Sequence, residues 1–176
     1  MATVHHTERG THVTTNEFDA FYQATRGRVV AALYALTGDL SEAQDVTQEA
    51  YARAWQRWGS VGTYGDPEAW VRTVARRIAY SGWRKARNRI TAYRRHGSAA
   101  HTPAPSEDTV ALVTALRQLS PEQREAIVLH HIVGLPVEEV ARQTGAPAGT
   151  VKTRLSRGRR ALSELLQVEV PEVSYA

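Results

Sequence analysis

The segment at residues 136–162, PVEEVARQTGAPAGTVKTRLSRGRRAL, constrains the fold of this chain more than any other stretch. Apolar residues recur at helical spacing on both sides of Gly145, a residue type that tolerates the left-handed backbone of a tight turn. Pro147 follows this turn, and proline is well suited to a helix start. The pattern predicts a short helix, a turn and a second helix, which is the layout of a DNA-binding helix-turn-helix.

The second predicted helix has an apolar side and a cationic side. Val151, Leu155 and Leu162 share the apolar side, with Gly158 between them. Residues 147–167 hold five Lys and Arg residues and one Glu, which favours nucleic-acid binding over an ordinary solvated amphipathic helix. Cationic and hydroxyl side chains suit base edges and phosphates in the major groove. The candidate DNA contacts are Lys152, Thr153, Arg154, Ser156, Arg157 and Arg160.

This segment also resembles a known family. GTVKTRLSRGRRAL is similar to the recognition helix in region 4 of the sigma-70 family, and specifically to that of the extracytoplasmic-function (ECF) sigma factors. In these proteins a GTVKSRLxRAR-like run reads the minus-35 promoter element. The resemblance extends upstream through LSPEQREAIVLHHIVGLPVEEVA. Pro136 departs from the family pattern, which more often has a serine that can cap the helix, but proline is compatible with a first helical turn.

A second segment, DVTQEAYARAW at residues 45–55, resembles region 2.2 of the same family. By this region sigma factors dock on the clamp helices of the RNA polymerase beta-prime subunit. Without the resemblance, the segment also fits a solvated helix face with two packed aromatic residues. The resemblance assigns the docking contacts to Asp45, Gln48, Glu49, Tyr51 and Trp55.

A third segment, at residues 67–89, resembles regions 2.3 and 2.4, which open and hold the minus-ten element. Melting a promoter requires cations for phosphates together with aromatic faces that replace base stacking, although these aromatics also fit the buried side of the helix. In ECF factors the preceding loop captures a flipped minus-ten base, and Tyr64 is the only aromatic residue of that loop here, at 59–66. Ser81 and Arg77 depart from the usual Asp and Asn, as in an actinobacterial ECF subgroup. The candidate minus-ten contacts are Tyr64, Arg72, Arg76, Arg77, Tyr80, Trp83, Arg84, Lys85 and Arg87.

The fold expected from these patterns is all-α, with two small helical domains joined by a flexible linker. We predict a disordered leader at 1–15, a first domain at 16–90, a linker at 91–107, a second domain at 108–167 and a tail at 168–176. The first domain is expected to hold helices at about 16–37, from 39 or 41 to 58, and from Pro67, directly after Asp66, to 89. The second is expected to hold four helices, at 108–119 and 121–133 and in the helix-turn-helix.

Local signals mark several of these helix ends. Ser41 followed by Gln44 fits a capping box, and Ser120 is expected to cap the helix at 121–133. Gly38 and Gly134 are expected to end helices.

Composition excludes several classes of function. The chain contains no cysteine, which removes disulfides, thiol nucleophiles and cysteine-based zinc sites. It has neither an apolar run of about 20 residues nor an apolar secretory core, so we expect a cytoplasmic protein without membrane insertion. His5, His6 and His12 are interpreted as part of a solvated leader. With no P-loop and no nucleophile constellation in the sequence, we predict no enzyme activity, no cofactor and no metal.

The cations are concentrated in two segments. Residues 67–95 carry nine Lys and Arg residues, and together with residues 147–167 they hold fourteen of the twenty-two in the chain. Two cationic segments on an otherwise acidic chain indicate two separate contacts with a polyanion.

Taken with the resemblance, these segments imply a sigma factor that directs promoter-specific transcription initiation. The implied partners are promoter DNA, the RNA polymerase core through its beta-prime clamp helices and beta flap, and an anti-sigma factor. Two alternatives are a stand-alone helix-turn-helix regulator, which would bind a promoter duplex without polymerase, and an inhibitor that only occupies polymerase or another factor.

Overall fold

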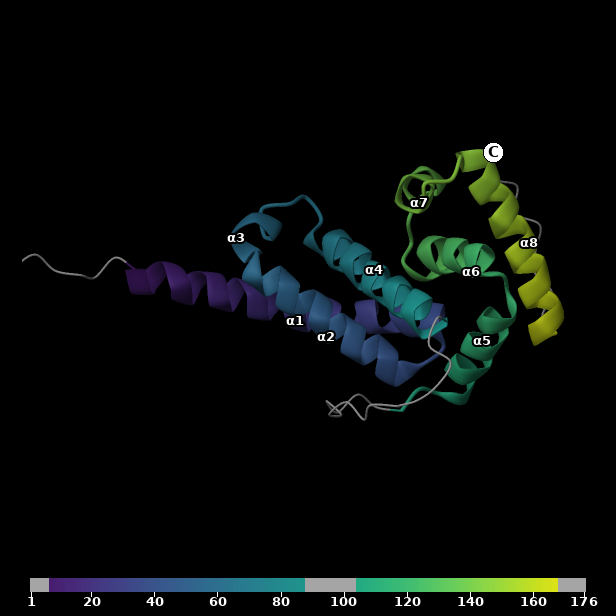
Figure 1. The fold of residues 1–176 in the computed structure, drawn as a ribbon, viewed down its shortest axis with the longest axis horizontal. Helices are drawn as coiled ribbons and strands as arrows, with labels where there is room; N and C mark the ends of the chain where they lie inside the picture. Colours follow the sequence, from purple (N-terminus) through teal and green to yellow (C-terminus); the bar gives the residue numbers. More distant parts are fainter. Residues whose placement is uncertain (1–6, 88–103, 168–176) are drawn as a thin grey trace, which may run out of the picture. The chain divides into compact units, whose positions relative to one another are not determined.

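The computed structural model describes residues 7–87 and 104–167, and the secondary structure in these two ranges is helical without strands (Figure 1). This confirms the all-α expectation. The tail predicted at 168–176 and most of the predicted linker lie outside the described residues. The elements are α1 (Thr7–Thr37), α2 (Leu40–Gln56), α3 (Trp58–Val61), α4 (Pro67–Arg87), α5 (Glu107–Gln118), α6 (Pro121–Ile127), the π-helix η1 (Val128–Ile132), α7 (Val137–Thr144) and α8 (Ala148–Leu166).

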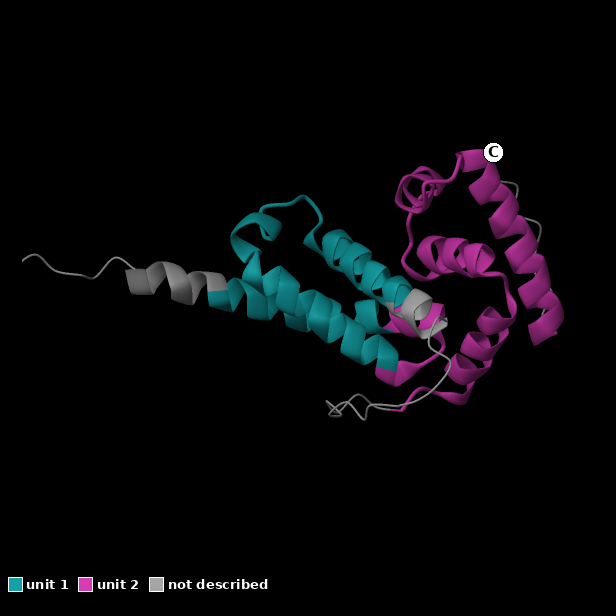
Figure 2. Ribbon diagram, viewed as in Figure 1, with its two compact units in different colours: residues 1–30, 42–94 teal, residues 31–41, 95–176 magenta. Residues whose placement is uncertain are grey.

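The chain divides into two units, which Figure 2 shows in teal and magenta. Unit 1 comprises residues 1–30 and 42–94, and unit 2 comprises residues 31–41 and 95–176. The last turns of α1 therefore group with the C-terminal helices, whereas the sequence patterns placed them in the first domain. The domain limits of 16–90 and 108–167 stay a prediction.

Helix α1 begins at Thr7, whereas a disordered leader was predicted through residue 15 and a helix start near Asn16. That part of the leader prediction is wrong. No proline interrupts residues 7–15, and extending a helix that already exists adds a backbone hydrogen bond for each residue ordered. Gly38 follows the end of the helix with φ of +76°, as its position in the sequence predicted.

The predicted capping box at Ser41 and Gln44 is wrong, because α2 begins at Leu40 and Ser41 lies inside its first turn. The inward face of α2 is confirmed, with Ala43, Val46, Ala50 and Ala54 all buried. The helix ends at Gln56, two residues before the predicted end.

The first three residues of the loop predicted at 59–66 are helical, because α3 spans Trp58–Val61. The amides of Ser60 and Val61 both donate to the Arg57 carbonyl at 2.9 Å, and the Val61 side chain is buried. Burying this valine draws the segment into a helical turn and leaves residues 62–66 as the loop. Pro67 then begins α4 as predicted, after the Asp66 carboxylate accepts a hydrogen bond from the Ala69 amide at 2.9 Å.

Unit 1 contains a cluster of aromatic rings between α1, α2 and α3. The Phe18 ring lies 5.0 Å from the Trp55 ring and 5.1 Å from the Trp58 ring, and the Tyr22 and Tyr51 rings are 5.0 Å apart. Aromatic pairs at such separations stabilise a core beyond the area that they bury.

In unit 2, α6 begins with the expected Ser120 cap, which forms a capping box with Gln123. The single helix predicted at 121–133 instead changes to the π-helix η1 after Ile127, and Gly134 ends it with φ of +83°. Helix α8 packs closely on α6 at Gly158, where an added Cβ would lie 2.9 Å from Ile127 Cγ1. Gly158 therefore belongs to the packed side of α8, together with Val151 and Leu155.

Candidate nucleic-acid interface

The predicted helix-turn-helix is present as α7, a turn and α8. Gly145 adopts a left-handed conformation with φ of 68°, and Pro147 precedes α8 at its N-cap position. The side chains of Val140, Val151 and Leu155 have no exposed surface, so α8 is held on one side by the core of unit 2. Pro136 stands at the N-cap of α7 without a side-chain capping bond, as its chemistry requires.

The predicted minus-35 residues separate into an outer face and two flanks of α8. Thr153, Ser156, Arg157 and Arg160 are exposed, whereas Lys152 and Arg154 are partly buried. Two of the exposed residues have local partners. Thr153 donates to the Gly149 carbonyl at 3.0 Å, and Arg160 pairs with Glu164 at 3.3 Å.

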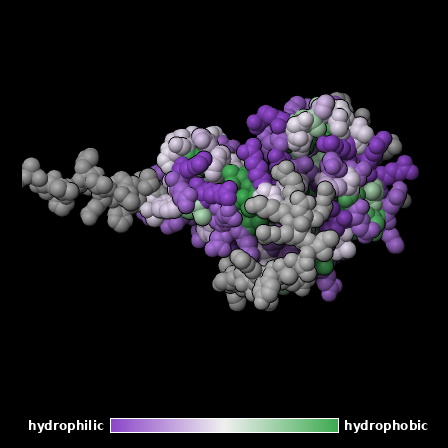
Figure 3. Space-filling model, viewed as in Figure 1, coloured by the Kyte–Doolittle hydropathy of each residue, from purple (hydrophilic) through white to green (hydrophobic). Residues whose placement is uncertain are grey.

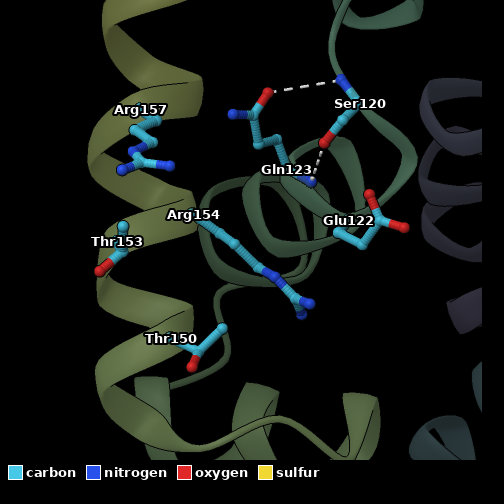
Figure 4. A pocket seen from close by; sticks show the side chains of 7 residues that line it. All are labelled: Ser120, Glu122, Gln123, Thr150, Thr153, Arg154 and Arg157. Atoms are coloured by element: carbon cyan, nitrogen blue, oxygen red, sulfur yellow. Dashed lines mark hydrogen bonds between the residues drawn. The ribbon is translucent and has the colours of Figure 1, made fainter.

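Arg154 and Arg157 face a hollow of about 460 Å³ between α8 and the start of α6 (Figure 4). In this view the Arg154 side chain extends from α8 toward Glu122 of α6. The sequence patterns identified Ser120 only as a cap and gave no signal for the other residues of α6 or for Thr150. The lining residues are Ser120, Glu122, Gln123, Thr150, Thr153, Arg154 and Arg157.

On α2 the predicted polymerase-docking residues divide by burial. Asp45, Gln48 and Glu49 are exposed and lie on one helix face, with Glu49 paired to Arg53. Trp55 is 43% exposed. Tyr51 is only 2% exposed, so it adds almost no surface to this helix face, and its role in docking stays a prediction. The Tyr51 ring belongs to the aromatic cluster. Helical spacing alone could not distinguish this buried position from one on the surface.

On α4 the predicted minus-ten cations also divide. Arg77 is exposed, and Arg76 and Tyr80 are partly buried. The side chains of Trp83, Arg84, Lys85 and Arg87 lie outside the described residues. Arg72 is 9% exposed and pairs with Glu68 at 2.9 Å, and its role as a phosphate contact stays a prediction. Two nearby carboxylates already balance its charge.

Tyr64 is 46% exposed and lies beside a second hollow, of about 420 Å³. The Tyr64 amide donates to the Val61 carbonyl at 3.1 Å, which ties the loop to α3. Gln56, Arg57 and Trp70 also line this hollow although they lie outside the loop predicted at 59–66. Their role depends on how α2, α3 and α4 meet, and this arrangement has no short-range sequence signal.

The surface of the described residues is largely hydrophilic on the face drawn in Figure 3. Among all the described residues, on whichever face, the exposed large apolar side chains include Trp55, Tyr64, Val110, Leu112, Ile132 and Leu165. Within the described ranges, none of the helices combines the length and the apolar character that crossing a membrane requires.

Comparison with known proteins gives the family. The model of Sigma-70 region 2 matches residues 21–89, and the model of Sigma-70, region 4 matches residues 109–162. The chain is also 36% identical over 143 residues to the ECF RNA polymerase sigma factor SigL of Mycobacterium tuberculosis, which covers 75% of this chain and 78% of SigL. The chain belongs to the ECF sigma factors of the sigma-70 family.

Two further matches support this family membership. SigJ of Mycobacterium tuberculosis is 31% identical over 156 residues, covering 81% of this ECF chain but only 49% of SigJ, so the chain spans about half the length of that relative. The structure of the sigma factor RpoE in complex with the anti-sigma factor NepR from Bartonella quintana matches with a TM-score of 0.71 and 29% identity. It covers 87% of this chain and 98% of that chain.

Proposed function

We propose that this ECF chain binds the RNA polymerase core, recognises the minus-35 and minus-ten promoter elements, and directs initiation by melting the promoter. The observation that carries the proposal is the joint presence of a helix-turn-helix with an exposed cationic face in unit 2 and an exposed acidic face on α2 in unit 1. The exposed acidic face of α2 would not contribute to DNA binding by a stand-alone regulator, because DNA is a polyanion.

Unit 2 would bind the minus-35 element through the outer face of α8. The exposed residues Thr153, Ser156, Arg157 and Arg160 would meet base edges, because α8 is anchored on its opposite side. Arg154 would bind a phosphate beside the groove, since it lies on the flank that faces α6.

Unit 1 would dock on the beta-prime clamp helices through Asp45, Gln48, Glu49 and Trp55. The hollow beside Tyr64 would receive a flipped base of the minus-ten element, where an exposed aromatic ring can replace the stacking that the base loses. Arg77 is exposed for contact with the backbone phosphates.

The remaining expectations follow from this role. The free energy for melting would come from binding to the opened strand, so the chain would need no catalytic activity of its own. It would work in the cytoplasm with polymerase. An anti-sigma factor is the expected regulator, and the beta flap is the expected second contact on polymerase. The RpoE structure, solved with NepR, is the observation that supports an anti-sigma partner.

The deciding experiment is transcription in vitro with sigma-free core polymerase and a library of genomic fragments. We expect selective initiation that depends on this chain. Arg157→Ala should weaken promoter binding by about 1–3 kcal/mol and relax the preference at one minus-35 position. Arg142→Ala is the matched control, because Arg142 is 75% exposed on α7 and pairs with Glu139.

Two results would reject the proposal. The first is an absence of selective initiation. The second is tight, specific binding to a promoter duplex without polymerase, which would indicate a stand-alone regulator.

A further inference from the structure

Arg72 differs from the other described cations of α4 in its surroundings. Its side chain is only 10% exposed, with Nη1 at 2.9 Å from Glu68 Oε1 and Nη2 at 3.4 Å from Asp66 Oδ2. Glu68 is itself 15% exposed and accepts a second ion pair from Arg28 Nη2 at 2.6 Å. Moving Arg72 to a phosphate would remove a buried partner from Glu68, and breaking a buried pair is costly.

Asp66 connects this network to the loop at 62–66. One of its carboxylate oxygens accepts from the Ala69 amide at the start of α4, and the other faces Arg72. Tyr64 lies two residues before Asp66. Trp70, which lines the same hollow as Tyr64, lies two residues before Arg72 on α4. The helix that forms one wall of the hollow therefore also anchors the end of the loop.

We propose that Arg72 is a positioning residue: through Asp66 it holds the loop at 62–66 so that Tyr64 faces the hollow, and it does not bind promoter phosphate. This inference rests on the proposed function of the hollow as a site for a minus-ten base. Under this inference the ion-pair network affects base discrimination indirectly, by positioning Tyr64, and does not contact the base.

The test uses holoenzyme formed from the full chain and core polymerase, with single-stranded minus-ten oligonucleotides that differ at one base. Asp66→Asn retains an oxygen that can cap α4 but removes the charge that faces Arg72. Arg72→Lys retains the charge but loses the two-pronged guanidinium geometry. Arg28→Gln is the matched control, since Arg28 also pairs with Glu68 but its side chain is 64% exposed.

We expect Asp66→Asn and Arg72→Lys each to reduce discrimination at one position roughly tenfold. The dependence of affinity on salt should stay unchanged, because no phosphate contact is lost. Arg28→Gln should retain the discrimination of the unmodified chain. In a Tyr64→Ala background, Asp66→Asn should have no further effect on discrimination, because it acts through Tyr64. If Asp66→Asn acted by a general loss of stability, it would still have an effect in that background.

Three results would overturn the inference. One is a uniform loss of affinity for all bases in the neutral variant Arg72→Gln with the salt slope reduced by about 0.7, the signature of a lost phosphate contact on a single strand. Another is unchanged discrimination in Asp66→Asn, whose exposed side chain and retained cap protect the fold. The third is an unmodified holoenzyme without base preference, which would reject the proposed function of the hollow as well.

Discussion

At Gly145 the backbone takes φ of 68° between α7 and α8, a conformation that costs other residues about 1–2 kcal/mol. Gly145→Ala should therefore lower the free energy of unfolding by about 1 kcal/mol. Gly149→Ala is the control in the first turn of α8, where an added Cβ meets no atom within 4 Å. It should raise stability by about 0.5–1 kcal/mol through helix propensity. Urea unfolding measures both, and equal effects would contradict the assigned strain.

Tyr51 gives unit 1 a dependence on alkaline pH. Burial raises the pKa of its phenol to about 12, and its hydroxyl lies 2.6 Å from Thr25 Oγ1. The unfolded phenol ionises near pH 10, so the folded state holds the proton more tightly. The stabilisation is therefore complete below about pH 10 and is lost as the pH rises toward about 12.

Tyr51→Phe removes this titration. At neutral pH the variant should lose about 1 kcal/mol, the usual contribution of a buried hydrogen bond. Its stability should then fall less steeply than that of the unmodified chain as the pH rises from about 10 to about 12. Urea unfolding across this range measures the difference, and parallel pH profiles would show that the phenol ionises equally in both states.

Among the elements, the start of α6 carries a cap whose contribution can be measured. The Ser120 hydroxyl accepts a hydrogen bond from the Gln123 backbone amide at 3.2 Å, and the Gln123 side-chain oxygen accepts one from the Ser120 backbone amide at 3.4 Å. Ser120→Ala should cost about 1 kcal/mol. Ser156→Ala, at an exposed position inside α8, should change stability by less than about 0.5 kcal/mol. Thermal unfolding distinguishes them, and a neutral Ser120→Ala would mean that the turn is held by packing alone.

The elements also show where local patterns suffice. Helical periodicity with Gly145 predicted α7 and α8 because both signals act within a few residues along the chain. The same reasoning failed at 59–66, where the first three residues of the expected loop belong to α3 and the Val61 side chain is buried. A valine near several glycines has no local feature that reveals this burial.

For the whole molecule, the two proposed DNA contacts lie in different units, and a linker would raise their effective concentration without coupling their geometry. Arg157→Ala and Tyr64→Ala should each weaken holoenzyme binding to a promoter by about 1–3 kcal/mol. The double variant should lose the sum of the two within about 0.5 kcal/mol. Promoter binding by holoenzyme at fixed salt measures this, and a loss far below the sum would show that the two contacts act as one.

The helical class, the helix-turn-helix, the Ser120 cap and the cationic face of α8 could be predicted from the sequence, because each depends on neighbours along the chain. Which side chains of those helices remain exposed depends on how the helices pack together. The tertiary structure buries Tyr51 in the aromatic cluster, pairs Arg72 with two carboxylates, and brings Gln56 and Trp70 to the hollow beside Tyr64. Such outcomes depend on which helix faces meet, and residues distant in sequence determine those contacts.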